Sequence, residues 1–64
     1  MDYRLKFISG FTGELKVRAG NIINALMEFK KKDQNITKKD FVIIKKSVFN
    51  TEYVIIKHVA GRYV

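Results

Sequence analysis

The sequence predicts a small two-layer α+β domain of ββαββ order, in which an antiparallel sheet has one helix packed on one face. Two segments near the C-terminus, residues 41–48 (FVIIKKSV) and 53–60 (YVIIKHVA), are nearly copies of each other and are rich in β-branched side chains, which favour strands. Two N-terminal segments alternate apolar and polar residues, and a helical pattern lies between the two pairs. One helix can cover only one face of a sheet, which predicts two layers. A chain of 64 residues is expected to form a single domain, 1–64.

The first predicted hairpin joins residues 2–8 to residues 14–19. Gly10 and Gly13 in the connection can supply the positive φ angles that a hairpin loop needs, and Phe11 is expected to be exposed at the tip. The alternation assigns six apolar side chains to the buried face, namely Tyr3, Leu5, Phe7, Leu15, Val17 and Ala19. It assigns four cations to the opposite face, namely Arg4, Lys6, Lys16 and Arg18.

The segment after this hairpin is predicted to be a helix that begins at Asn21, whose side chain can cap the first turn. Apolar residues then recur at i, i+3, i+4 and i+7 and form one stripe of Ile22, Ala25, Leu26 and Phe29. Lysines occupy residues 30–32, where the helix dipole favours cations. Residues 37–40 match a capping pattern and predict one short turn before the third strand.

The register of the second hairpin is open at this level. A two-residue loop at Asn50 and Thr51 would place one set of side chains on a common face with Lys46 and Lys57, namely Val42, Ile44, Val48, Tyr53, Ile55 and Val59. A three-residue loop would offset the pairing and mix those faces. We expect Ile44 to be a core position whose truncation to alanine is strongly destabilising.

Surplus β-branched side chains in the second hairpin predict self-association. One helix cannot cover both faces, so Ile43, Val54 and Ile56 are expected on the uncovered face. An apolar patch on a domain of this size is typical of a partner surface, and we expect a two-fold homodimer that uses the sheet face or the sheet edge of residues 41–59. The alternative is that the C-terminal tail, residues 60–64, partly buries both faces.

The composition argues against an enzyme, a metal site, a cofactor or a small-molecule substrate. The six acidic residues are isolated from one another, there is no cysteine, and His58 is the one histidine. We expect His58 to be a surface or cross-strand residue. No apolar run reaches the roughly 18 residues of a membrane span, and the N-terminus has no apolar signal segment. A cysteine-free chain fits a reducing compartment, so we expect a cytoplasmic protein without a membrane partner.

The charge predicts an anionic partner. Thirteen Lys and Arg against six Asp and Glu give a formal net charge of +7. Clustered cations bind phosphates through counterion release, so the leading hypothesis is a regulatory, nucleic-acid-binding module. The candidate binding residues are the four cations of the first hairpin and three lysines of the second, that is Arg4, Lys6, Lys16, Arg18, Lys45, Lys46 and Lys57.

Two other interpretations of the cationic face stay open. The cations can simply solvate an exposed sheet face and keep it from aggregating. Alternatively, the chain is a protein-binding inhibitor or adaptor that docks onto an acidic host protein. The lysine- and isoleucine-rich composition of so small a domain resembles that of phage or mobile-element proteins from AT-rich genomes, so such an origin belongs to this alternative.

Overall fold

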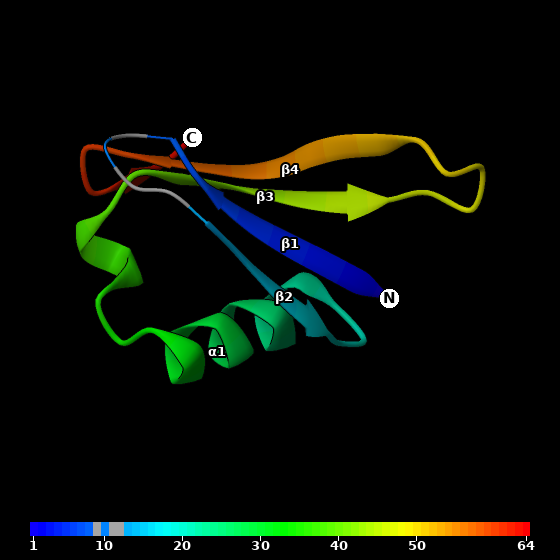
Figure 1. Cartoon of the computed structure of the whole chain (residues 1–64), viewed down its shortest axis with the longest axis horizontal. Coiled ribbons are helices and arrows are strands. Elements are labelled where there is room, and N and C mark those ends of the chain that lie inside the picture. Colours follow the sequence, from blue (N-terminus) through cyan, green and yellow to red (C-terminus); the bar gives the residue numbers. More distant parts are fainter. Residues whose placement is uncertain (9, 11–12) are drawn as a thin grey trace.

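The predicted two-layer α+β fold is confirmed. The computed structural model describes residues 1–8, 10 and 13–64, and Figure 1 shows one antiparallel sheet with a helix against one face. The elements in chain order are β1 (Asp2–Phe7), β2 (Glu14–Arg18), α1 (Ile22–Lys32), the 3₁₀ helix η1 (Ile36–Lys38), β3 (Phe41–Lys46), β4 (Glu52–Val59) and β5 (Arg62–Tyr63).

The strand order in the sheet is β2-β1-β3-β4-β5, so the N-terminal strand β1 lies inside the sheet, between β2 and β3. The chain leaves the first hairpin at β2, passes through α1 and η1 on one face, and returns as β3 beside β1. The C-terminal tail does not cover a face of the sheet. It adds the short edge strand β5, which pairs with the end of β4 at His58 and Val59.

The first hairpin has the predicted faces. Tyr3 lies opposite Val17 and Leu5 lies opposite Leu15, and these side chains point into the core together with Phe7. Gly10 and Gly13 have φ angles of 71° and 102°, which are the left-handed values expected of this connection. Phe11, predicted at the exposed tip, lies outside the described residues.

The helix begins as predicted, because the Asn21 side chain accepts a hydrogen bond of 2.9 Å from the backbone N–H of Asn24. The apolar stripe faces the sheet, with Ala25 and Phe29 fully buried. The predicted short turn exists as η1, but it begins one residue earlier and places Ile36 at full burial in the core. The complete core cluster is Tyr3, Leu5, Val17, Ala25, Phe29, Ile36, Phe41 and Ile43.

The second hairpin has the longer of the two predicted loops. The Ser47 N–H donates to the Thr51 carbonyl at 2.8 Å, which leaves three residues, 48–50, in the loop. Asn50 adopts a φ of 66°, the left-handed residue that follows the turn in three-residue hairpin loops. A β-bulge then interrupts β4, because Ile43 pairs with Ile56 and Ile44 with Val54.

The loop and the bulge correct the predicted faces of β3 and β4. Ile43 is fully buried and Ile56 packs against the core, so both lie on the helix side and not on the uncovered face. Ile44, expected in the core, is half-buried on the opposite face. A shift of the pairing by one residue moves each side chain of a strand to the opposite face. The third loop residue and the extra residue at the bulge each cause such a shift in β4. The two-residue loop would have placed Tyr53 and Ile55 on the face of Lys46 and Lys57. Their side chains lie instead on the helix side of the sheet.

Candidate functional site

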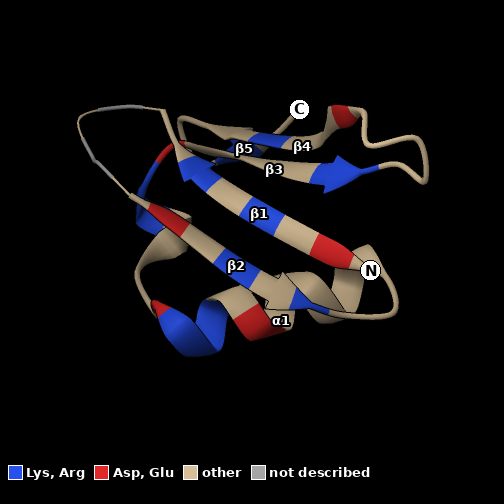
Figure 2. Ribbon diagram, turned by 45° about the vertical axis from the view of Figure 1, so that its right-hand side comes forward, with Lys and Arg blue, Asp and Glu red and all other residues tan. Residues whose placement is uncertain are grey.

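The face of the sheet that α1 leaves uncovered carries most of the predicted binding residues, and we call it the open face. Its side chains alternate along each strand with core residues; Arg4, for example, lies between the buried Tyr3 and Leu5. Figure 2 shows cationic and acidic positions alternating with uncharged ones along β1 and β2. The open face comprises Asp2, Arg4, Lys6, Glu14, Lys16, Arg18, Val42, Ile44, Lys46, Glu52, Val54 and Lys57, together with Val59 and Arg62 at the β4–β5 pair.

The strand register arranges these side chains in three rows that run across β2, β1, β3 and β4. The row nearest the 48–50 loop contains Arg18, Asp2, Lys46 and Glu52. The middle row contains Lys16, Arg4, Ile44 and Val54. The third row contains Glu14, Lys6, Val42 and Lys57. Cations therefore occur in every row, interspersed with carboxylates and aliphatic side chains.

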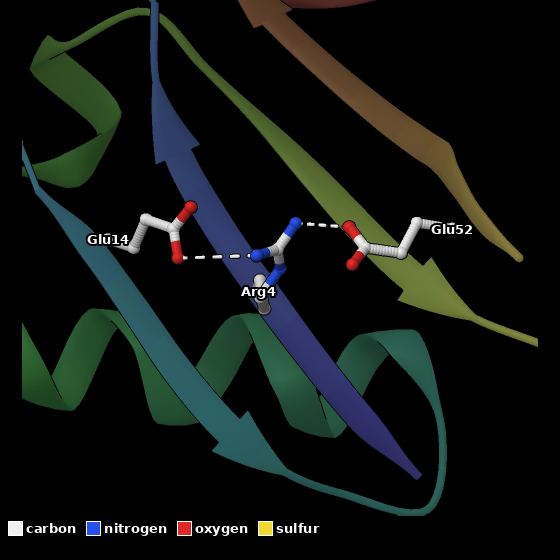
Figure 3. Close-up of polar contacts among 3 residues, drawn as sticks. All are labelled: Arg4, Glu14 and Glu52. Atoms are coloured by element: carbon white, nitrogen blue, oxygen red, sulfur yellow. Dashed lines mark hydrogen bonds and ion pairs between the residues drawn. The ribbon is translucent and has the colours of Figure 1, made fainter. Parts of the chain in front are cut away.

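Arg4 lies at the centre of the open face and is held between two carboxylates, as Figure 3 shows. Its Nη1 lies 3.5 Å from Oε2 of Glu14 on β2, and its Nη2 contacts Oε2 of Glu52 on β4. The Arg4 side chain is 31% exposed. The guanidinium thus connects strands that are separated in the sheet by β3, and two carboxylates already neutralise its charge.

Arg18 is also paired. Its Nε donates to Oδ1 of Asp2 at 3.0 Å, in the cross-strand pair of β1 and β2. This hydrogen bond, together with the charge of Arg18, holds the pKa of the Asp2 carboxyl below its usual value, and the same contact raises the pKa of Arg18. Both groups are mostly exposed, so the pair contributes little to stability.

Four lysines of the open face have no ion pair within the part of the chain that the structure describes: Lys6, Lys16, Lys46 and Lys57. The seventh predicted residue, Lys45, does not belong to this surface. It lies opposite Tyr3 and Tyr53 on the helix side of the sheet. Seven cations, with Arg62 of β5 included, against three carboxylates leave the open face with a net charge of +4.

A hollow of about 480 Å³ lies between the middle row and the row nearest the 48–50 loop. Ile44 contributes apolar lining and two carboxylates, Asp2 and Glu52, contribute negative charge. The cationic lining comes from Arg4, Lys16, Arg18 and Lys46. Such a depression can receive an anionic group near the unpaired lysines, with aliphatic contact beneath it.

The acidic residues are occupied in structural contacts. Outside the open face, Glu28 pairs with Lys31 and Asp33 with Lys39, and Asp40 accepts a hydrogen bond from the N–H of Ala60. Among the described residues, no three His, Cys, Asp or Glu side chains lie together as metal ligands would.

His58 has a structural environment. It is 2% exposed, lies across from Phe41 in the β3–β4 pair and stacks on that ring with centroids 4.7 Å apart. Its Nδ1–H donates to the carbonyl of Lys39 at 2.8 Å, and the ring of Tyr63 lies 4.8 Å away. The prediction of a cross-strand position is confirmed, but the side chain is buried and not at the surface. These contacts join β3, β4, β5 and the segment after η1.

Sequence reasoning missed the tip of the β3–β4 hairpin. Val48 is 94% exposed and Phe49 is 87% exposed. The sequence pattern places Val48 in the strand segment 41–48 and Phe49 in the link, residues 49–52, between the two segments. The available signal was two large apolar residues next to Asn50 in a segment where turn chemistry requires neither.

In comparisons with known proteins, no protein-family model, no curated protein and no solved structure matches this chain. Within the described residues, no helix has both the length and the apolar character needed to cross a membrane.

Proposed function

We propose that the protein is a small, non-enzymatic, nucleic-acid-binding module of regulatory function that contacts phosphates through the open face. The observation that supports this proposal is the arrangement of Lys6, Lys16, Lys46 and Lys57, one on each of four adjacent strands, all exposed and without an ion pair among the described residues. An unpaired ammonium group is a point charge that binds phosphate in many orientations. Displacing the counterions around a nucleic acid supplies the driving force.

The spacing of these lysines suits a polyanion. Neighbouring strands lie about 4.8 Å apart, so β2 to β4 span roughly 14 Å of surface. The carboxylates of Glu14 and Glu52 bind Arg4 and reduce its contribution, so the lysines carry the phosphate contacts in this proposal. Phosphate contacts do not read bases, and we therefore expect binding that tolerates different sequences.

A matched pair of double variants tests the proposal. Lys16→Ala with Lys46→Ala removes two charges from the open face, and Lys30→Ala with Lys32→Ala removes two exposed charges from the end of α1. Fluorescence anisotropy with labelled mixed-sequence oligonucleotides over a series of salt concentrations measures affinity and its salt dependence. Four phosphate contacts predict a log–log slope of about −2.8 for single strands and about −3.6 for duplex.

The open-face variant should reduce the size of this slope by about 1.4–1.8, because two contacts are lost. The helix variant should leave the slope nearly unchanged. If no oligonucleotide binds at low salt, or if both variants weaken binding equally, the open face is not a nucleic-acid interface.

A second candidate function rests on a different feature of the same surface. Val42, Ile44 and Val54 place aliphatic side chains among the charges of β3 and β4, and Val54 is 55% exposed. Mixed aliphatic and cationic surfaces fit an acidic protein. We propose as the alternative a phage- or mobile-element-encoded inhibitor or adaptor of such a host protein. A single band in a pull-down that persists after nuclease treatment would favour it. Either function would be exercised in the cytoplasm.

We also propose that the domain forms a homodimer through the outer edge of β4. The short strand β5 pairs only with the end of β4, so residues 52–56 have no neighbouring strand on that side among the described residues. An open edge with β-branched side chains can pair with a second copy.

A further inference from the structure

The tip of the β3–β4 hairpin presents an aromatic ring to solvent. Figure 1 shows this hairpin projecting past α1, with its tip away from the rest of the domain. Phe49 there is the most exposed aromatic side chain among the described residues, at 87%, and its neighbour Val48 is exposed to 94%. Neither side chain contributes to the core cluster. Their apolar character has no role in stabilising the fold.

Hydrogen bonds around Ser47 hold the tip in a defined conformation. The Ser47 Oγ accepts from the N–H groups of Phe49 and Thr51, each at 3.2 Å, and the Ser47 carbonyl accepts from the N–H of Asn50 at 3.1 Å. Three consecutive backbone amides are thus satisfied within the loop. The ring of Phe49 is therefore presented by an ordered backbone, which lowers the entropy lost when it binds something.

The tip continues the cationic surface. Lys46 is the last residue of β3 and lies three residues before Phe49, a separation that the chain limits to at most about 11 Å. Lys46 also borders the hollow that Lys16 and Arg18 line. An exposed aromatic side chain thus lies close in the chain to Lys46, the open-face cation at the base of the hairpin tip. Proteins that bind single-stranded nucleic acids combine these two features, cations for the backbone and an aromatic side chain on which a base stacks.

We infer that Phe49 stacks on an unpaired base of a single-stranded nucleic acid whose phosphates contact Lys46 and Lys16. This inference rests on the proposed function and adds the class of nucleic acid and the residue that selects it. In a duplex the base faces are already stacked on their neighbours, so the ring finds a partner only on a single strand. A phenyl ring has no hydrogen-bonding group, so the contact tolerates any base.

The aromatic character of Phe49 distinguishes this inference from other uses of an apolar tip. A protein pocket or a lipid surface would need apolar volume, which leucine also supplies, whereas stacking needs a flat π-system. Three variants separate the cases: Phe49→Leu keeps the apolar volume, Phe49→Trp keeps the ring, and Val48→Ala is the neighbouring control. The chain has no tryptophan, so Phe49→Trp also introduces a single fluorophore at the tip.

The experiment is a titration of each variant with a single-stranded oligonucleotide of about 12 nucleotides and with the matching duplex. Phe49→Leu should weaken single-strand binding by about 5- to 150-fold, the range measured when stacked aromatics are removed. Phe49→Trp should bind as the parent does, and its emission should fall on binding. Val48→Ala should change affinity by less than about twofold. The salt slope should be the same in all of them, because no phosphate contact is removed.

The outcomes separate this inference from the proposed function. If neither single strands nor duplex bind at low salt, the proposed function fails and this inference with it. If binding persists but Phe49→Leu matches the parent, or if the emission of Phe49→Trp does not respond, the inference alone is overturned. Equal losses on single strands and duplex would also overturn it. Circular dichroism of each variant confirms the fold, which a fully exposed tip residue should not affect.

Discussion

Two neighbouring isoleucines provide the most direct test of the structure. Ile43 and Ile44 are adjacent in β3 but point to opposite faces of the sheet. Ile43 is 0% exposed and lies between Leu5 of β1 and Ile56 of β4. Ile44 is half-buried on the open face, beside Arg4. The two substitutions to alanine remove the same atoms, so any difference in stability reports burial alone.

The expected difference is large for a domain of this size. Removing a fully buried isoleucine side chain costs about 2–5 kcal/mol, whereas truncating one that stays half in solvent should cost about 1 kcal/mol. A 64-residue domain has a total free energy of unfolding of roughly 3–10 kcal/mol. Ile43→Ala therefore removes a major part of the stability, and Ile44→Ala removes a minor part.

Urea unfolding followed by circular dichroism measures both variants. With a slope of about 1 kcal/mol per molar urea, Ile43→Ala should lower the midpoint by about 2 M or more and Ile44→Ala by about 1 M. A larger loss for Ile44→Ala would mean that β3 is shifted by one residue, because such a shift exchanges the faces. If Ile44→Ala costs as much stability as Ile43→Ala, but only at high protein concentration, then a second copy of the chain covers Ile44 on the open face.

Three further predictions address the charge network, the buried histidine and the oligomeric state. Glu14→Gln combined with Glu52→Gln frees Arg4 for phosphate and should steepen the salt slope by about 0.7–0.9; an unchanged slope would contradict the assignment of Arg4 as neutralised. His58→Ala removes the ring stacked on Phe41 and leaves a backbone carbonyl without its donor, so urea unfolding should show a loss of about 2–4 kcal/mol, and a loss below about 0.5 kcal/mol would refute the role. Sedimentation at micromolar concentration should give twice the 7.5 kDa of the chain, and a monomer at high concentration would exclude the dimer.

The elements with one clear local pattern could be predicted from sequence. In the first hairpin, apolar and charged residues alternate strictly, which predicts the two faces of its strands. The glycines in the connection predict the turn. The helix had both a capping residue, Asn21, and a four-residue apolar stripe that ends at Phe29. These signals depend only on neighbours in the chain, which is why the structure reproduces them.

The second hairpin lacked such a signal. Its Val-Ile-Ile triplets are apolar at consecutive positions, so the hydrophobic pattern does not distinguish one face from the other. The bulge at Ile55 then adds one residue to β4, and no feature of the local sequence predicts it. The edge strand β5 has two residues, too few for any periodicity to be visible. For these reasons Ile43 and Ile44 could not be assigned to their faces from the sequence.

The sequence predicts the face on which most of the candidate site residues lie, but it does not predict which of them form ion pairs. Alternation alone located Arg4, Lys6, Lys16 and Arg18 on one face. The contact between Arg4 and Glu52 joins residues far apart in the chain and depends on the order β1-β3-β4, which the sequence does not display. Which cations form ion pairs among the described residues is thus a property of the topology.

The interior position of β1 also has a consequence for how the chain folds. Each hairpin closes between segments that are near in sequence, but the seam between β1 and β3 joins Leu5 to Ile43 and encloses α1 and η1 in the intervening loop. Closing a long loop is entropically unfavourable until the contacts it enables have formed. We therefore expect the seam to form late and to limit the folding rate. During synthesis on the ribosome, β1 therefore keeps one edge unpaired until β3 has left the exit tunnel.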